Sequence, residues 1–320
     1  MKEAMGADPP ILARPRRRRD RIIALLFLGL AALILLVLPR GSLGLDSTFV
    51  LTSQRAGVNI EAPDLVVQTA PSLYVLGSLV AALAAWQWLR GFRRMGGALG
   101  TVSVLGIAAF LVWAAQDKSL NLTGMLVSSL VRATPIALAA LSGIYSERSG
   151  VVNIGIEGMM LTGAFASVVF TSVSGSQLMG VAAGLAIGMV MAALHALLSI
   201  RFRVNQIVSG AGVIILALGL TSYLQRSVLN LYPELNQPGP SIAAVPIPGL
   251  WKIPVLGPLL FNQSPIIYAL FGMLVLTQVL MYRTRWGLRV RSVGEHPRAA
   301  DTLGINVFRT RYISVLLSGA

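Results

Sequence analysis

Long apolar runs alternate with short polar segments along most of the chain. A helix needs about 20 apolar residues to cross a bilayer, and eight runs meet or approach that length. They are residues 22–38, 72–89, 98–115, 123–144, 157–174, 178–199, 207–229 and 265–282. A ninth run begins near Tyr312 and is still apolar at Ala320. The pattern predicts an all-α, polytopic membrane protein with about nine spans, the last of them incomplete.

The two ends of the sequence lead to further expectations. A helix that stops inside lipid leaves backbone groups unsatisfied, so we expect the native chain to continue beyond Ala320 into further helices. At the other end, the apolar run after the basic residues 1–21 is longer than the 7–15 residues of a signal-peptide core. No small-residue cleavage pattern precedes Arg40. We therefore predict a first span that is retained.

The composition agrees with a membrane protein. Hydrophobic residues make up 55% of the chain and charged residues only 12%, whereas soluble domains carry about 25% charged residues. The chain has no cysteine, which excludes disulfides and cysteine-based metal sites. The net charge of +14 suggests nucleic-acid binding unless the position of the basic residues explains it otherwise.

The basic residues are distributed unevenly between alternate loops. If the N-terminus is cytoplasmic, twenty of the 26 lysines and arginines fall in inner segments, five fall in outer loops, and only Arg132 lies within a span. This bias follows the positive-inside rule and predicts a cytoplasmic N-terminus. It also accounts for the net charge, and no basic-aromatic recognition motif is present. We therefore predict no nucleic-acid partner.

We divide the sequence into a basic cytoplasmic tail (1–21), a group of three spans (22–120) and a core (121–320). The outer loop 231–263 holds seven prolines, which prevent regular helix. It is either a rigid platform for a partner or a cap over helix ends. The inner loop 283–311 contains "EHPRAADTLGI". Pro297 suits the first position of a helix and Gly304 suits its end, so we expect a short docking helix there.

A polar segment, "ERSGVVNIGIEGMML" (147–161), separates two spans. Its glycines permit a break in the helix, and irregular backbone at membrane depth occurs where it is buried in protein or lines a cavity. Asn153 and Glu157 share a face if the segment is helical. Asn153 is also a candidate cap for the helix that carries Glu157, whose charge would lie near its positive end. A solvated turn with a helix cap is the alternative.

Arg132 lies near the middle of the fourth span, three residues before Pro135. An unpaired arginine there costs about 2.5–3.5 kcal/mol on insertion scales, so we expect its side chain to face protein or water. We favour a role in lining a solute path, together with Pro135, Asn153 and Glu157, because broken helices with polar groups mark such paths in transporters. The alternative is a structural ion pair with Glu147 or Glu157.

The sixth span repeats glycine every four residues, at Gly180, Gly184 and Gly188. Small residues at this spacing allow membrane helices to approach closely. We therefore predict that this face packs against another helix.

Common catalytic motifs are absent from the sequence. It has no H-E-x-x-H, no G-x-S-x-G, and no phosphate-binding loop of the G-x-x-x-x-G-K-[ST] type. We therefore expect no metal, no cofactor and no ATP site of its own, and we favour transport over catalysis. The spans are almost free of acidic residues, which disfavours the alternative of a self-contained secondary transporter.

Four stretches carry a specific resemblance. They are "ATPIALAALSGIYSERSGVVNIGIEGMMLTGAF", "NQIVSGAGVIILALGLTSYL", "PVLGPLLFNQSPIIYAL" and "GLRVRSVGEHPRAADTLGINVFRTRYISVLLSGA". Each resembles the integral-membrane permeases of ABC importers that handle ribose, branched-chain amino acids and nucleosides, and the nucleoside/simple-sugar branch is the most similar. The similarity runs from about residue 121 to the end. It implies a permease bundle of the type II importer kind.

The resemblance also implies partners and a location. They are a cytoplasmic ABC ATPase that binds the ATP, a second permease subunit forming a paralogous heterodimer, and an external solute-binding protein or lipoprotein that delivers a nucleoside or simple sugar. The location is the cytoplasmic membrane of a bacterial-type cell. In the family the inner loop contacts the ATPase, and the matching positions here are Gly294, Glu295, Pro297, Ala300, Gly304, Ile305 and Asn306.

Overall fold

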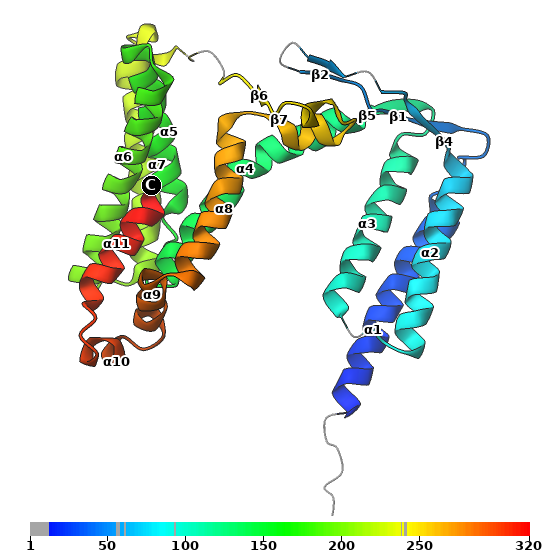
Figure 1. Cartoon of the computed structure of the whole chain (residues 1–320), viewed down its shortest axis with the longest axis horizontal. Coiled ribbons are helices and arrows are strands. Elements are labelled where there is room, and N and C mark those ends of the chain that lie inside the picture. Colours follow the sequence, from blue (N-terminus) through cyan, green and yellow to red (C-terminus); the bar gives the residue numbers. More distant parts are fainter. Residues whose placement is uncertain (1–12, 56–57, 61, 93, 238, 240–241) are drawn as a thin grey trace, which may run out of the picture. The chain divides into compact units, whose positions relative to one another are not determined.

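The computed structural model describes residues 13–55, 58–60, 62–92, 94–237, 239 and 242–320. Residues 1–12 of the predicted basic tail therefore lie outside the described residues. The chain forms two compact units, one of Met1–Leu126 with Lys252–Val255, the other of Val127–Trp251 with Leu256–Ala320. Each unit is described by itself below (Figure 1).

Eight of the described helices are long and apolar enough to cross a membrane. They are Arg18–Val37, Thr69–Leu89, Met95–Ala114, Leu122–Glu147, Ile156–Ser174, Gln177–Arg201, Gln206–Leu229 and Pro265–Arg283. Each coincides with one predicted span, and the ends differ by only a few residues. The ninth run forms a shorter helix, Val307–Gly319. The chain is thus mostly helical and polytopic, as the apolar pattern predicted.

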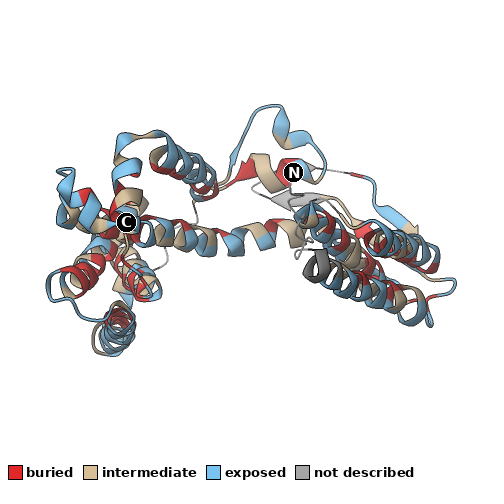
Figure 2. Ribbon diagram, turned by 90° about the horizontal axis from the view of Figure 1, so that it is seen from below, coloured by how far each residue is buried: buried red, intermediate tan, exposed pale blue. Residues whose placement is uncertain are grey.

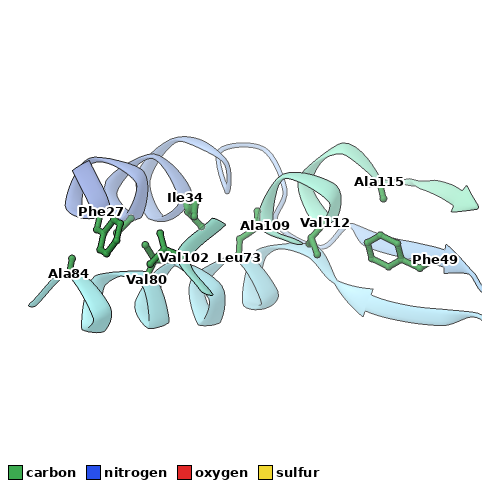
Figure 3. Close-up of a cluster of buried hydrophobic side chains, with 11 residues drawn as sticks. Phe27, Ile34, Phe49, Leu73, Val80, Ala84, Val102, Ala109, Val112 and Ala115 are labelled. Atoms are coloured by element: carbon green, nitrogen blue, oxygen red, sulfur yellow. The ribbon is translucent and has the colours of Figure 1, made fainter. Parts of the chain in front are cut away.

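The first unit contains three long helices. They are α1 (Ala13–Ala32) with its continuation η1 (Leu33–Val37), α2 (Thr69–Leu89) and α3 (Met95–Ala114). α1 packs against α2, and α2 packs against α3. Phe27 and Ile34 from the first helix meet Leu73 and Val80 of α2 in a cluster of buried apolar side chains (Figure 3).

A small sheet covers one end of this unit, and the all-α prediction missed it. Its strands are β1 (Asp46–Val50) in the centre, β4 (Leu65–Gln68) antiparallel to it and β5 (Lys118–Asn121) parallel to it. A separate hairpin joins β2 (Ser53–Arg55) and β3 (Val58–Ile60). Strands of three to five residues are too short for an alternating pattern to stand out beside apolar runs of span length.

One buried serine ties the sheet to the helices. The Ser47 side chain is fully buried. Its Oγ lies 2.7 Å from Thr69 Oγ1, at the start of α2, and donates a hydrogen bond of 2.7 Å to the Val112 carbonyl of α3. A buried polar group without partners is costly, so these bonds fix the position of β1 over the helix ends.

The second unit contains the remaining helices. They are α4 (Leu122–Glu147, whose first residues belong to the other unit), α5 (Ile156–Ser174), α6 (Gln177–Ala196) with η2 (Leu197–Arg201), α7 (Gln206–Leu224) with η3 (Gln225–Leu229), α8 (Pro265–Arg283), α9 (Arg285–Glu295), α10 (Pro297–Thr302) and α11 (Val307–Gly319). α5 packs against α6 and α7, and α11 packs against α6 and α9. α9 and α10 lie at one end of this unit (Figure 1).

The proline-rich loop 231–263 holds only short elements. They are η4 (Pro233–Asn236), β6 (Val245–Pro246), η5 (Leu250–Lys252), η6 (Gly257–Phe261) and β7 (Asn262–Gln263). β6 pairs with β7, and the Tyr268 hydroxyl donates 2.9 Å to the Val245 carbonyl. No regular α-helix occurs in the described part of this loop, as its prolines predicted. The choice between a partner platform and a cap stays open.

Large apolar side chains cover the outside of the helices. Leu178 is 81% exposed, Ile215 70% and Val275 66%, and exposed positions run along most helix ribbons (Figure 2). A helix that is apolar on all sides belongs in a membrane or inside a larger assembly. The exposed apolar faces therefore fit lipid or further membrane helices.

Candidate functional site

The segment between α4 and α5, residues 148–155, forms a compact turn that we call the polar turn. The backbone N–H groups of Ser149, Gly150 and Val151 donate back to carbonyls in the last turn of α4, at 2.9–3.2 Å. Gly150 has a φ of +82°, a conformation that strongly favours glycine. The helix therefore breaks at the glycine, as the sequence predicted.

The predicted role of Asn153 as a helix cap is wrong. α5 begins at Ile156, and its N-cap is Gly155 without a side-chain hydrogen bond. Asn153 lies two residues too early to cap, and it is not helical, so it shares no helix face with Glu157. Instead Asn153 is buried, and its Nδ2 donates 3.0 Å to Ser318 Oγ of α11. Its Oδ1 has no partner among the described residues.

Glu157 lies in the first turn of α5, and its side chain is exposed. A carboxylate at this position is stabilised by the partial positive charge of the helix N-terminus. The favourable electrostatic position predicted for Glu157 is therefore present, without any contribution from Asn153.

A cavity of about 460 Å³ lies beside the polar turn, among α4, α5, α6, α8 and α11. Apolar and small residues dominate its wall, which includes Pro135, Met159, Gly184 and Gly188, with the hydroxyl groups of Ser142, Ser167 and Ser318 as its polar side chains. Ser142 Oγ lies 2.8 Å from Ser318 Oγ, and Asn153 reaches the same wall through Ser318.

The predicted path residues are only partly brought together. Pro135 lines the cavity, and Asn153 contacts its wall. Arg132 and Glu157 are exposed and do not line it. Within the part of the chain that the structure describes, no ion pair joins Arg132 to Glu147 or Glu157, so the ion pair considered as an alternative is not formed here. The role of Arg132 in a solute path stays a prediction.

The three glycines of α6 lie where helices approach most closely. A Cβ added to Gly180 would overlap Thr171 of α5, and a Cβ at Gly184 would lie 3.1 Å from the Gly163 carbonyl oxygen of α5. A Cβ at Gly188 would overlap the Gly319 carbonyl of α11. These positions therefore bring α6 against two helices, α5 and α11.

The inner loop 283–311 folds into two short helices, of which the sequence analysis predicted one. α10 begins at Pro297 and ends before Gly304, whose φ is +79°, as expected. α9 was missed. Its signal was the helical spacing of Gly287, Val290 and Val293, which are buried, but the three arginines of the same helix obscured it.

The predicted coupling positions differ in exposure. Ala300 is buried, Pro297 and Ile305 are half-buried, and Glu295, Gly304 and Asn306 are exposed. Asn306 caps α11, because its Oδ1 accepts a 2.8 Å bond from the Arg309 N–H. Gly294 packs against the polar turn so closely that an added Cβ would overlap the Arg148 carbonyl.

Side chains from α6 and α7 also bind the polar turn. The Val152 N–H donates 2.6 Å to Gln206 Oε1 at the start of α7. The fully buried His195 of α6 places Nε2 3.2 Å from the Val152 carbonyl and Nδ1 3.1 Å from Ser209 Oγ. A carbonyl only accepts, so Nε2 carries a proton. No local sequence pattern indicates that these residues converge on the turn.

Arg311, at the end of the inner loop, contacts the turn from α11. Its Nε donates 3.2 Å to the Ser149 carbonyl. Burial lowers the pKa of the Arg311 guanidinium, but an arginine stays protonated in proteins. A fixed positive charge therefore lies at the C-terminal end of α4.

Eight helices of membrane-spanning length, glycine-mediated helix contacts and a folded inner loop packed on a broken helix junction are the features of a polytopic membrane protein. A family model described as the branched-chain amino acid transport system permease component matches residues 125–320. The chain belongs to this permease family. The match includes both the polar turn and the inner loop.

Several curated relatives are similar to this chain, and their names state a solute. The chain is 42% identical over 199 residues to the guanosine ABC transporter permease protein NupQ of Bacillus subtilis, covering 60% of this chain and 62% of the relative. It is 35% identical over 207 residues to the nucleoside ABC transporter permease protein NupC of Lactococcus lactis, covering 61% and 63%. It is 30% identical over 205 residues to the glucose ABC transporter permease protein TsgB13 of Haloferax volcanii, covering 61% and 54%.

The chain thus spans roughly three fifths of the length of the curated relatives that it matches. No solved structure matches. The resemblance to nucleoside and sugar permeases, inferred from the four quoted stretches, is confirmed.

Proposed function

We propose that the chain is a membrane-spanning subunit of an ATP-driven importer and that it forms part of the path for a nucleoside or a related simple sugar. The observation that carries this proposal is the family match over residues 125–320. It includes the cavity, the polar turn and the inner loop, which are the parts such a subunit needs.

The energy source would be a separate ATPase. The sequence contains no phosphate-binding loop, so we propose that hydrolysis occurs on a cytoplasmic partner and that this chain is not an enzyme. The inner loop offers a surface for docking. Leu288 is 60% exposed and Leu303 81%, and Arg289 of α9 and Arg298 of α10 are exposed as well.

The transport step would change the cavity beside the polar turn. ATP shifts a conformational equilibrium only if it binds the two states with different affinity, and the ATPase must then move a part of this chain. α9 and α10 are the exposed elements of the inner loop, and α9 contacts the polar turn through Gly294. Movement of the loop would reach α4 and α5, whose residues line the cavity.

The solute and the further partners are inferred from the relatives. The names of the relatives specify guanosine, nucleosides and glucose, which share hydroxyl groups and lack a net charge. The cavity wall offers such a solute the hydroxyl groups of three serines. A second, paralogous permease subunit and an external solute-binding protein or lipoprotein complete the proposed importer.

Two measurements test the proposal. The first is purification of the tagged native protein in mild detergent, followed by mass spectrometry of the bound proteins. We expect an ABC-type ATPase and a second permease. The second is uptake of tritium-labelled guanosine and of labelled glucose by vesicles that contain the purified complex, with and without ATP inside.

A variant of the inner loop sharpens the test. Glu295 is exposed at the end of α9, so Glu295→Arg reverses a surface charge without disturbing the packing. We expect loss of ATP-driven uptake with normal membrane insertion. Asp64→Arg, at an exposed position outside the family match, is the matched control and should transport normally. Normal uptake by Glu295→Arg would exclude Glu295 from the coupling surface.

A self-contained secondary transporter is the competing function. It predicts uptake that persists without ATP and is abolished by dissipating the ion gradients, and no ATPase in the purified complex. That combined result would refute the importer.

A further inference from the structure

Three segments that are distant in sequence meet at the polar turn. They are Ser149 and Gly150 of the turn itself, Gly294 near the end of α9, and Arg311 near the start of α11. The inner loop thus contacts the end of α4 at two points, at Gly294 near its middle and at Arg311, its last residue. The coupling positions matched from the family include Gly294 but not Arg311.

The contact between Gly150 and its two neighbours is tight. A Cβ added to Gly150 would lie 3.2 Å from Arg311 Nη2 and 3.3 Å from Gly294 Cα. Gly150 also has a φ of +82°, which side chains disfavour. Between Gly150 and Gly294 no side chain separates the two backbones, so a displacement of Gly294 toward the turn must displace the turn.

Arg311 supplies the polar part of the contact. Its Nε donates to the Ser149 carbonyl at 3.2 Å, two residues beyond the end of α4. The carbonyl groups at a helix C-terminus carry a partial negative charge, and a cation placed there is stabilised. Arg311 thereby joins α11 to α4 through an interaction in which the charge and the hydrogen bond reinforce one another.

We propose that Arg311 is a positioning residue that holds the inner loop against the end of α4, so that movement of the loop reaches the cavity. This inference rests on the proposed function, because it assigns the residue through which the ATPase acts on the solute path. Ser142 and Pro135 of α4, which line the cavity, lie about two and four helical turns before this contact. A shift at Ser149 therefore moves part of the cavity wall.

The test uses the complete purified transporter in vesicles and measures two rates, ATP hydrolysis and uptake of tritium-labelled guanosine. We expect Arg311→Ala to keep its ATPase subunit and its hydrolysis while uptake per ATP falls at least tenfold. Arg311→Lys keeps the positive charge and an N–H donor group, so its uptake per ATP should fall less than that of Arg311→Ala. A purely structural role for Arg311 would lower both rates together and leave their ratio unchanged.

Arg201→Ala is the matched control. Arg201 is an exposed arginine at the end of η2, on the same predicted side of the membrane and outside the inner loop. We expect its uptake per ATP to equal that of the unsubstituted protein.

The outcomes separate this inference from the proposed function. If the unsubstituted protein shows ATP-driven uptake and Arg311→Ala keeps the same uptake per ATP, the role of Arg311 is refuted while the importer stands. If the unsubstituted protein shows no ATP-driven uptake of guanosine or glucose and no bound ATPase, the importer and the inference are both refuted. If Arg311→Ala fails to fold, Arg311→Lys gives the decisive measurement. Unchanged rates of hydrolysis and uptake in Arg311→Lys, and hence an unchanged uptake per ATP, would refute the role of the guanidinium.

Discussion

A single methyl group at Gly188 should separate two helices. Gly188 lies in the interior of α6, and a Cβ there would overlap the carbonyl oxygen of Gly319 in α11. That oxygen belongs to the main chain, so the overlap can be removed only if a whole helix moves by roughly 1 Å. A gap of this size is enough to lose dispersion contacts between the two helices. Overpacking of this kind costs about 1–3 kcal/mol.

The control removes the effect of helix propensity. Replacing glycine by alanine in a helix interior is itself favourable by about 0.5–1 kcal/mol, which would mask part of the cost. Gly212 lies in the interior of α7, and an added Cβ would meet no atom within 4 Å. The difference between Gly188→Ala and Gly212→Ala therefore isolates the packing term, and we expect it to be about 1–3 kcal/mol.

The assay is reversible unfolding in mixed micelles with increasing SDS, followed by circular dichroism, for the native protein and both variants. The free energy of unfolding should fall in Gly188→Ala and rise slightly or stay constant in Gly212→Ala. Equal stability of the two alanine variants would show that α6 and α11 do not approach through Gly188, and the packing argument would be wrong.

Three further substitutions test other parts of the structure. Ser47→Ala leaves two buried partners unsatisfied and should cost about 1–3 kcal/mol, measured as the stability of the first unit to proteolysis. Gly304→Ala forces a side chain to adopt a φ of +79° at a cost of about 1–2 kcal/mol, and faster hydrogen exchange in α10 would reveal it. Arg132→Ala should not lower stability, because Arg132 is exposed and its replacement removes a charge from a membrane span, yet it should abolish uptake if the side chain lines the path. Unchanged uptake would remove Arg132 from the path.

The spans were predictable because lipid imposes one strong constraint on the backbone. Every polar backbone group must be satisfied within the segment, so an apolar run of sufficient length is a helix whatever its neighbours are. The short inner helix α10 was predictable for a local reason, since Pro297 and Gly304 mark its two ends. Both signals are contained in the segment that they describe.

The contacts of the polar turn were not predictable, because they depend on residues far away in the sequence. α5 begins at Ile156, and the residue before it, Gly155, packs against Val213 of α7. A Cβ added to Gly155 would lie 3.2 Å from Val213 Cγ1. Asn153 consequently points to Ser318, 165 residues later. Arg311 shows in sequence only as one of several basic residues of the inner loop, and nothing local indicates the Ser149 carbonyl as its acceptor.

A close backbone contact between α5 and α6 has a mechanical consequence. Gly163 and Gly184 face one another reciprocally, because a Cβ on either would lie 3.1 Å from the carbonyl oxygen of the other. Two backbones in such contact have no side-chain layer in which to slide or rotate, so we expect this helical hairpin to move as a rigid body. Any hinge then belongs at its ends, where Gly155 precedes α5 and the π-helical turn Leu197–Arg201 follows α6.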